Sequence, residues 1–256
     1  MANIVALRRR PASAPARADL AELIRSTGLT GLVRQASGHS DAGWDADRLL
    51  PVVPELRPLL SAGGLRRGTI VGVTLTPGGS SVLLALLAEA SRAGSWCAVV
   101  GVPTLGVVAA AEMGIELSRL ALIPNPGPEW PSVVAALLDG VDIVVAAPPG
   151  PVATTVAGRL AARARQRGGV LVVVETGPAS ARCPGADVTL EAVHSEWEGL
   201  GSGRGRLTRR QLTVHARGRG AAARRRQVQL WLPTVSGGLE AAPASAGYLA
   251  AVQEAV

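Results

Sequence analysis

The stretch from Gly68 to Gly94, GTIVGVTLTPGGSSVLLALLAEASRAG, restricts the possible folds more than any other part of this 256-residue chain. Residues 69–75 predict an apolar strand, residues 76–81 predict a tight glycine turn, and the leucines and alanines that follow predict a long apolar helix. A phosphate-binding loop, G-x-x-x-x-G-K-[ST], lies between a strand and a helix in the same way, and its lysine neutralises phosphate charge. This chain contains no lysine. The sequence therefore predicts the framework of a phosphate loop without its charge.

The turn itself offers two glycines and two serines: Gly78, Gly79, Ser80 and Ser81. One interpretation is a residual anion site formed by amide groups at the helix N-terminus. The other is an inherited turn in which Ser80 or Ser81 caps the helix. We favour the second, because amides and a helix dipole alone compete poorly with water for phosphate.

Strands and helices alternate regularly from this unit to Glu175. Runs such as VVV and IVV show little polar alternation, which favours a mostly parallel sheet covered by helices on both faces. The expected strands after the first are 96–102, 120–123, 142–147 and 169–175, and the expected helices are 105–113, 130–138 and 152–167.

The pattern changes after Pro184. Residues 187–194, 211–216 and 227–232 alternate apolar and polar side chains, which predicts an antiparallel extension with one wet face. Two segments rich in glycine and arginine, GLGSGRGR and ARGRGAAARRR, are expected to join these strands as loops. The proline-containing residues 49–60 predict an extended lead-in that packs on the sheet.

The predicted organisation is α/β with three parts. Residues 1–48 form a basic disordered arm with a short helix and a linker, residues 49–235 the core, and residues 236–256 a flexible tail. The short helix has one apolar face that is a candidate partner-binding surface, formed by Leu20, Leu23 and Ile24. It could dock on a partner, on a second copy of the chain, or on its own domain.

Charge and cysteine usage narrow the partners and the compartment. The net charge of +7 favours an anionic partner, and two cysteines, Cys97 and Cys183, are too few for a disulfide framework and predict buried thiols. No segment reaches the roughly 18 consecutive apolar residues of a membrane span. The N-terminal apolar piece precedes its arginines, the reverse of a secretory signal. A cytoplasmic protein without membrane contact is expected.

The later basic segment is the candidate nucleic-acid surface. Arginine forks match phosphates, and glycine lets a chain follow a nucleic-acid strand. Residues 199–239 contain no acidic residue and nine arginines: Arg204, Arg206, Arg209, Arg210, Arg217, Arg219, Arg224, Arg225 and Arg226. We expect non-specific phosphate contact with single-stranded or primer–template DNA. A solvated charged hairpin, or a surface for an acidic protein, remains the alternative.

Four segments in order make the chain resemble a RecA-type recombinase core over residues 50–232. They are GGLRRGTIVGV (63–73), AEASRAGSWCAVV (88–100), MGIELSRLALIPNP (113–126) and VDIVVAA (141–147). Within that superfamily the chain is most similar to the ImuA-type proteins of the actinobacterial ImuA′ branch. These are RecA-like accessory proteins encoded beside an inactive Y-family polymerase homologue and an error-prone replicative-type polymerase.

The resemblance also shows which catalytic positions have changed. The lysine of the loop falls on Gly79, the Mg²⁺-orienting aspartate on Ala146 or Ala147, and the water-polarising acid near Pro103. ATP hydrolysis needs all three functions. We therefore expect a pseudo-ATPase with no catalytic residue, no cofactor and no metal site. Glu175 ends a buried strand where a nucleotide-sensing residue would lie, but an edge carboxylate is the simpler interpretation.

The resemblance implies an accessory role in damage-induced mutagenic translesion synthesis. The expected partners are the inactive Y-family polymerase homologue and, through it, the error-prone polymerase and the sliding clamp, with self-association as a further expectation. Two alternatives stay open: an active RecA-like NTPase or recombinase motor, and a SulA-like cell-division inhibitor. The three scattered histidines, His39, His194 and His215, form no catalytic or metal-binding arrangement in the sequence.

Overall fold

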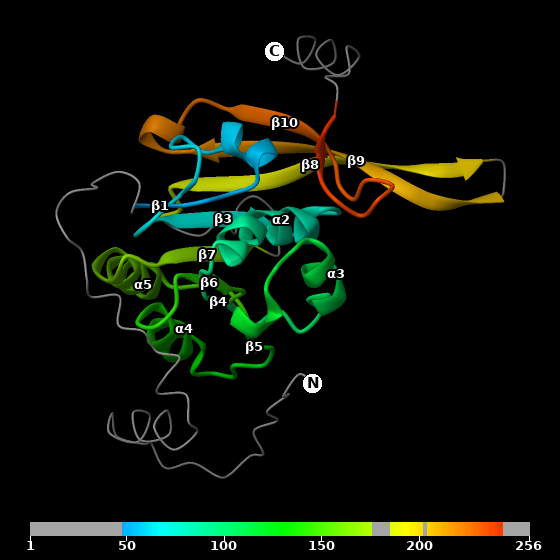
Figure 1. Ribbon diagram of the computed structural model, residues 1–256. Coiled ribbons are helices and arrows are strands. Elements are labelled where there is room, and N and C mark those ends of the chain that lie inside the picture. Colours follow the sequence, from blue (N-terminus) through cyan, green and yellow to red (C-terminus); the bar gives the residue numbers. More distant parts are fainter. Residues whose placement is uncertain (1–47, 176–184, 202–203, 243–256) are drawn as a thin grey trace. The chain divides into compact units, whose positions relative to one another are not determined.

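A nine-stranded sheet organises the part of the chain that the computed structural model describes, residues 48–175, 185–201 and 204–242 (Figure 1). All of these residues belong to the second of two units into which the chain divides, residues 39–256. The strand order is β11-β10-β9-β8-β3-β7-β6-β4-β5. The fold is therefore α/β, with a large parallel part and an antiparallel C-terminal part, as predicted.

The alternating elements lie close to their predicted bounds. The strands are β3 (Ile70–Thr74), β4 (Cys97–Val100), β5 (Leu120–Ile123), β6 (Ile143–Ala146) and β7 (Val170–Glu175). The helices are α2 (Gly79–Arg92), α3 (Val107–Glu112), α4 (Trp130–Leu138) and α5 (Thr154–Arg167). Strand β3 pairs in parallel with β7 on one side and with β8 (Val188–Gly201) on the other. The strand–turn–helix unit of residues 68–94 thus starts from an inner strand of the sheet.

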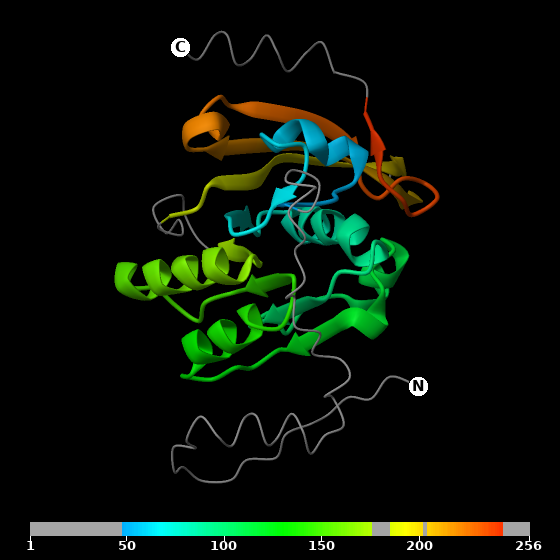
Figure 2. The same ribbon diagram turned by 60° about the vertical axis from the view of Figure 1, so that its left-hand side comes forward.

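Helices cover both faces of the parallel part (Figure 2). On one face, α2 and α3 pack with the lead-in segment over side chains such as Val71, Val145 and Val172. On the other face, α4 and α5 cover Ile70, Val144 and Leu171. The valine runs alternate between these two apolar layers, which explains why they show so little polar alternation.

The lead-in packs on the sheet as expected, but it is not fully extended. Strands β1 (Leu49–Leu50) and β2 (Leu65–Arg66) pair with each other, and a 3-10 helix, η3 (Pro54–Leu59), lies between them. Pro54 stands at the start of η3, where its fixed φ and missing N–H are tolerated. The one-turn spacing of Leu56 and Leu59 buries both side chains, and this burial outweighs the preference of a proline-rich segment for an extended conformation.

The antiparallel part contains the main correction to the predicted elements. Strand β8 continues to Gly201 and β9 (Arg204–Gly218) begins at Arg204, so GLGSGRGR belongs mostly to paired strands instead of a loop. Glycine fits here for two reasons. Gly199 and Gly205 have positive φ beside the register shift between β8 and β9, and a Cβ on either residue would lie within 2.5 Å of the backbone of the opposite strand. The second basic segment contains the end of β9, the one-turn helix η6 (Gly220–Ala222) and the first residue of β10 (Arg226–Trp231). Strand β11 (Glu240–Ala241) pairs with β10 beyond the predicted core end at residue 235.

Candidate functional site and nucleic-acid interface

The turn after β3 is a four-residue β-turn, much shorter than a phosphate loop. The Gly79 N–H donates to the Thr76 carbonyl at 2.7 Å. Pro77 occupies the first central position and Gly78, with φ 102° and ψ −17°, the second, which is the geometry of a type II turn. The Ser81 and Val82 amides both donate to the Gly78 carbonyl at 3.1 Å. Three amides at the start of α2, those of Gly79, Ser81 and Val82, are therefore already bound to backbone carbonyls.

The predicted serine cap is wrong. Gly78 is the N-cap of α2, and no side chain caps the helix. The turn is instead anchored to the antiparallel part of the sheet, because the Thr76 hydroxyl donates to the Ala192 carbonyl at 2.7 Å.

Side chains of β8 and β9 fill the space over the turn. A Cβ added to Gly78 would lie 2.5 Å from Cδ2 of Leu212 and 3.5 Å from Cβ of Ala192. Leu212 is fully buried. Leu212 therefore packs directly against the turn at Gly78.

Arg210 places a positive charge beside the turn, although it is remote in sequence. Its Nη2 donates to the Ser81 hydroxyl at 2.5 Å and its Nε to the Leu232 carbonyl at 2.9 Å. The guanidinium also lies 5.0 Å from the ring centroid of Trp197. With 9% of the residue exposed, burial lowers the pKa of Arg210. Arg210 is thus engaged inside the fold, unlike most other arginines of the predicted nucleic-acid surface.

The neighbouring strand ends carry no carboxylate where the resemblance would place one. Ala146 is fully buried against α4 and α5, and Ala147 is buried on the opposite face. The Ala147 carbonyl lies 2.4 Å from the position of a Cβ on Gly101, so the adjoining loops touch. Pro103 is exposed. Glu175 is buried at 7% exposure, with Oε1 lying 2.9 Å from a potential Cβ on Gly72, inside the sheet.

The structure separates the predicted arginine surface into two groups. Strand β9 has 15 residues, so its ends lie about 45 Å apart. We call the projecting strand segments Trp197–Gly201 and Arg204–Arg209 the ribbon; it carries Arg204, Arg206 and Arg209. The sheet-end arginines are Arg217, Arg219, Arg224, Arg225 and Arg226. Arg210 belongs to neither group.

The sheet-end arginines are mostly exposed. Arg219, Arg224 and Arg225 are exposed and form no ion pair in the described ranges. Arg219 also lines an open cavity of about 190 Å³, together with Arg66 of β2 and Asp187. Arg66 is not predicted from the sequence as a phosphate-binding residue, because the segment GGLRRG is interpreted only as the start of the first strand. The pair of adjacent arginines in this segment could have indicated a basic surface.

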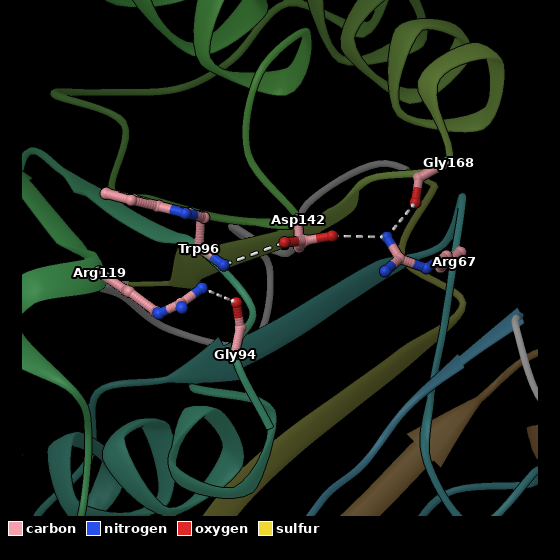
Figure 3. Close-up of polar contacts among 6 residues, drawn as sticks. All are labelled: Arg67, Gly94, Trp96, Arg119, Asp142 and Gly168. Carbon is pink, nitrogen blue, oxygen red and sulfur yellow. Dashed lines mark hydrogen bonds and ion pairs between the residues drawn. The ribbon is translucent and has the colours of Figure 1, made fainter. Parts of the chain in front are cut away.

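Arg67, the other member of that pair, has a structural role (Figure 3). Its Nη1 donates to Oδ1 of Asp142 at 2.9 Å and to the Gly168 carbonyl at 3.3 Å, while the Trp96 amide donates to Oδ2 of Asp142 at 2.9 Å. Nearby, Arg119 donates to the Gly94 carbonyl at 2.5 Å. These contacts join the segments that lead into β3, β4, β6 and β7. Arg67 is therefore committed to the fold, and Arg66 is exposed.

The remaining titratable groups fit structural roles. Nε2 of His194 lies 3.4 Å from Oε2 of Glu196, and Nε2 of His215 lies 3.2 Å from Oε1 of Gln227. Burial and, to a smaller extent, Asp142 raise the pKa of the Cys97 thiol to about 12, so the predicted buried thiol is confirmed there. Among the residues that the structure describes, no three His, Cys, Asp or Glu side chains form a potential metal site.

Several predictions fall on residues that the structure does not describe. The candidate partner surface of Leu20, Leu23 and Ile24, together with Cys183 and His39, lies outside the described ranges, as does most of the predicted tail. The side chain of Arg204 is likewise not described. Within residues 48–175, 185–201 and 204–242, no helix has the length and apolar character needed to cross a bilayer.

Apart from Val235, the exposed large apolar side chains of the described residues lie on two sets of elements. One group lies on α3, on the short helix η4 (Leu117–Arg119) and on the edge strand β5: Val107, Val108, Leu117 and Leu122. The second group lies on or next to the ribbon: Val193, Trp197, Leu200 and Leu207. Both are candidate interaction surfaces.

Comparison with known proteins finds a family model and a relative that match this chain. Residues 58–179 match the model of the MT3502 N-terminal domain. An uncharacterized protein of Mycobacterium tuberculosis, Rv3395c, is 37% identical over 177 residues, which cover 62% of this chain and 85% of the relative. The matched residues include β3, the closed turn, α2 and the segments joined by Asp142. Since it covers 85% of this relative at 37% identity, the chain belongs to the same family as Rv3395c.

Proposed function

We propose that this protein is a non-catalytic, RecA-like adaptor of the ImuA type that acts in damage-induced mutagenic translesion DNA synthesis. It binds an inactive Y-family polymerase homologue and, through a separate basic surface, DNA. The observation that supports the non-catalytic part is the closed turn after β3, against which Leu212 packs at Gly78.

Three physical obstacles support the absence of ATP hydrolysis. A phosphate would have to displace Leu212, whose burial contributes about 1.5–3 kcal/mol. It would also have to break the turn, because the amides of Gly79, Ser81 and Val82 already have backbone partners. A Mg²⁺ ion would find the buried methyl group of Ala146 where an orienting carboxylate is required. These features weigh against the alternative of a motor protein.

The fold supports the RecA-like assignment without depending on catalysis. The β3–turn–α2 unit starts from an inner strand of a parallel sheet whose faces are both covered by helices. The four sequence segments that resemble the recombinase core occupy β2–β3, α2–β4, η4–β5 and β6 in that order. These observations support our proposal of a RecA-like scaffold whose function has moved to its surfaces.

DNA contact is best supported at the sheet-end arginines. Arg219, Arg224 and Arg225 are exposed, and Arg66 adds a fourth exposed guanidinium from a different part of the chain. Exposed arginines without carboxylate partners are free to bind phosphates and release counterions. The adjoining cavity of about 190 Å³ gives this surface a concave region beside Arg66 and Arg219.

The polymerase homologue is proposed to bind the apolar surface around α3 and β5. Val108 is 73% exposed and Leu122 is 43% exposed on an edge strand. Exposed apolar groups beside a free strand edge are typical of protein interaction sites. This surface is separate from the arginines of β9 and β10, so both partners can be held at once.

The non-catalytic assignment is tested by measuring Mg²⁺-dependent ATP turnover and nucleotide binding by the full chain. We expect turnover equal to background and no nucleotide-induced increase in thermal stability. Ser81→Ala serves as the matched variant, because turnover by a contaminating enzyme would persist in it. Turnover above background that Ser81→Ala removes would overturn the proposal.

The two binding surfaces are tested separately. Replacing Arg219, Arg224 and Arg225 by alanine should lower the slope of log affinity against log salt by about 0.7 for each single-strand phosphate that the variant no longer neutralises. Arg163→Ala, which removes an arginine paired with Asp139, is the control and should leave the slope unchanged. Val108→Asp with Leu122→Asp should abolish co-purification with the polymerase homologue, whereas Val235→Asp, at an equally exposed site, should not.

A further inference from the structure

The ribbon projects beyond the rest of the sheet (Figure 1). Strand β8 pairs with β3 only as far as Glu191, and β9 pairs with β10 only from Gln211 onward. Beyond these points the two strands continue and pair with each other to Gly201 and Arg204. Among the residues that the structure describes, the ribbon is therefore an arm of two strands, about 15–20 Å long, with no strand paired to either outer edge.

The charge on the ribbon is positive toward its tip. Its one acidic residue, Glu198, is bound by Nε of Arg209 at 2.6 Å, and Arg209 also stacks on Trp231 at 3.9 Å. Arg206 is exposed and has no ion pair within the described ranges. Arg204 follows the tip in sequence. From Gly199 to Arg209 the sequence therefore adds arginine charge and contains no acidic residue.

Apolar side chains accompany this charge. Leu200 is 64% exposed and Leu207 is 44% exposed, although both lie on paired strands where they could have been polar at no structural cost. Glycines at 199, 201 and 205 leave the backbone bare between them. An arm with exposed leucines, bare backbone and arginines is suited to a surface that is anionic at its rims and partly apolar at its floor.

We propose that the ribbon inserts into a groove of duplex DNA. This inference rests on the proposed DNA-binding function and assigns a duplex contact to the ribbon in addition to the phosphate contacts of the sheet-end arginines. Two strands about 4.8 Å apart fit a major groove about 12 Å wide. Two-stranded ribbons also twist strongly, which lets them follow a groove.

The side chains favour a duplex over a single strand. Arg206 reaches phosphates at the groove rim, and Leu200 and Leu207 contact the groove floor, where thymine methyl groups and sugars are apolar. Single strands are held chiefly by bases stacked on aromatic rings. The ribbon has one aromatic residue, Trp197, whose ring already lies beside the Arg210 guanidinium.

The test compares the affinity of the full chain for a duplex of about two helical turns and for one of its strands alone, by fluorescence anisotropy at equal salt. Leu200→Ser with Leu207→Ser should weaken duplex binding about tenfold and change single-strand binding less than about twofold. Arg206→Ala should lower the duplex salt slope by about 0.9. Val235→Ser, which removes an apolar side chain that is 72% exposed outside the ribbon, is the control and should change neither affinity. Thermal unfolding checks that each variant remains folded.

The other outcomes identify which proposal fails. Loss of binding in the sheet-end arginine variants with unchanged duplex binding in both ribbon variants would overturn the ribbon inference and leave the DNA-binding function standing. No binding of either DNA by the native chain would overturn both. Ribbon variants that bind DNA normally but no longer co-purify with the polymerase homologue would show that the arm contacts protein.

Discussion

The carboxyl and the amino ends of the parallel strands differ in which groups bind the backbone and in whether their arginines are exposed. At the carboxyl end of β3 the turn is closed by its own amides, by Leu212 and by the buried guanidinium of Arg210. At the amino ends, carboxylates bind backbone amides: Asp142 accepts from Trp96, and Asp187 accepts from Ile70 at 2.8 Å. Arg66 and Arg219 remain exposed beside a cavity there.

The comparison shows where positive charge is available to a ligand. Open α/β sheets usually bind ligands outside the carboxyl ends of their strands. Here Arg210, the arginine beside the closed turn, is bound to Ser81 and to the Leu232 carbonyl. The exposed sheet-end arginines lie at the other end, so we expect phosphate contacts to form there, in addition to the contact proposed for Arg206 on the ribbon, which extends beyond the carboxyl end of β3. The carboxyl end, where ligands usually bind, therefore contributes to the stability of this fold. Variants at this end can be measured separately for unfolding free energy and for ligand binding.

The largest effect is expected for Leu212→Ala at the carboxyl end. Leu212 is fully buried, and truncating such a leucine costs about 2–5 kcal/mol of unfolding free energy. Urea unfolding measures the loss, and Leu207→Ala, at a 44% exposed site, is the control and should change stability by less than about 0.5 kcal/mol. We expect Leu212→Ala to gain no nucleotide affinity, because the turn amides stay bound. Nucleotide binding by this variant would mean that leucine packing alone closes the site.

Gly78→Ala should have the next largest effect. A side chain at φ 102° costs about 1–2 kcal/mol, and overpacking against Leu212 adds about 1–3 kcal/mol. Gly127→Ala is the matched control, since Gly127 also has positive φ but no atom within 4 Å of its potential Cβ. The excess cost at Gly78 should disappear when Leu212→Ala is added. If the excess persists in the double variant, the clash with Leu212 is not its cause.

Asp142→Ala tests the amino end. The carboxylate of Asp142 binds the Arg67 guanidinium and the Trp96 amide, so its removal should cost about 1–3 kcal/mol (Figure 3). The control is Asp139→Ala, which removes a carboxylate paired only with the exposed arginines of α5 and should cost less than about 1 kcal/mol. Equal losses in the two variants would show that Asp142 contributes no more than a surface ion pair.

The elements of the fold and the loss of the catalytic side chains can be predicted from local sequence, but the closure of the turn cannot. The predicted bounds of β5 and α4 match the observed ones, because apolar period and flanking prolines or polar residues define them locally. The missing lysine and the alanines at 146 and 147 already indicate a changed site. The closure itself is not predictable, since Arg210 and Ser81 are 129 residues apart and meet only through sheet pairing.

The division of the arginines into the ribbon and the sheet-end group could likewise not be predicted from local sequence. Glycine and arginine in GLGSGRGR resemble a loop by composition, yet cross-strand pairing between β8 and β9 extends the ribbon through them. An alternation of apolar and polar side chains cannot indicate that the strands continue here. The exposed part of a two-stranded arm has no buried face, so the sequence need not alternate. Arg66 joins the sheet-end arginines only because the β1–β2 pair brings the lead-in beside β8 and β9.

The smallest effect is expected at His215, which reports the charge of the sheet-end arginines. Burial lowers the pKa of His215 from its ordinary value of 6.5, Arg225 and Arg217 lower it further, and Gln227 and Glu191 act in the opposite direction. The unfolded chain therefore binds a proton more readily than the folded chain, and each unit of difference corresponds to about 1.4 kcal/mol. Stability should be complete above the unfolded pKa and should fall as the pH drops through 6.5 toward the folded pKa. His215→Gln should flatten this decline.

Arg225→Ala separates the contribution of charge from that of burial. Removing this cation should raise the pKa of the His215 ring, followed by NMR titration, while Arg163→Ala should leave it unchanged. Binding of a phosphate-rich ligand at the sheet-end arginines should raise the pKa in the same direction, because bound anions offset their charge. If DNA binds the chain without changing the titration of His215, the bound phosphates lie elsewhere, and the amino ends of the strands are not the charged surface that the comparison assigns to them.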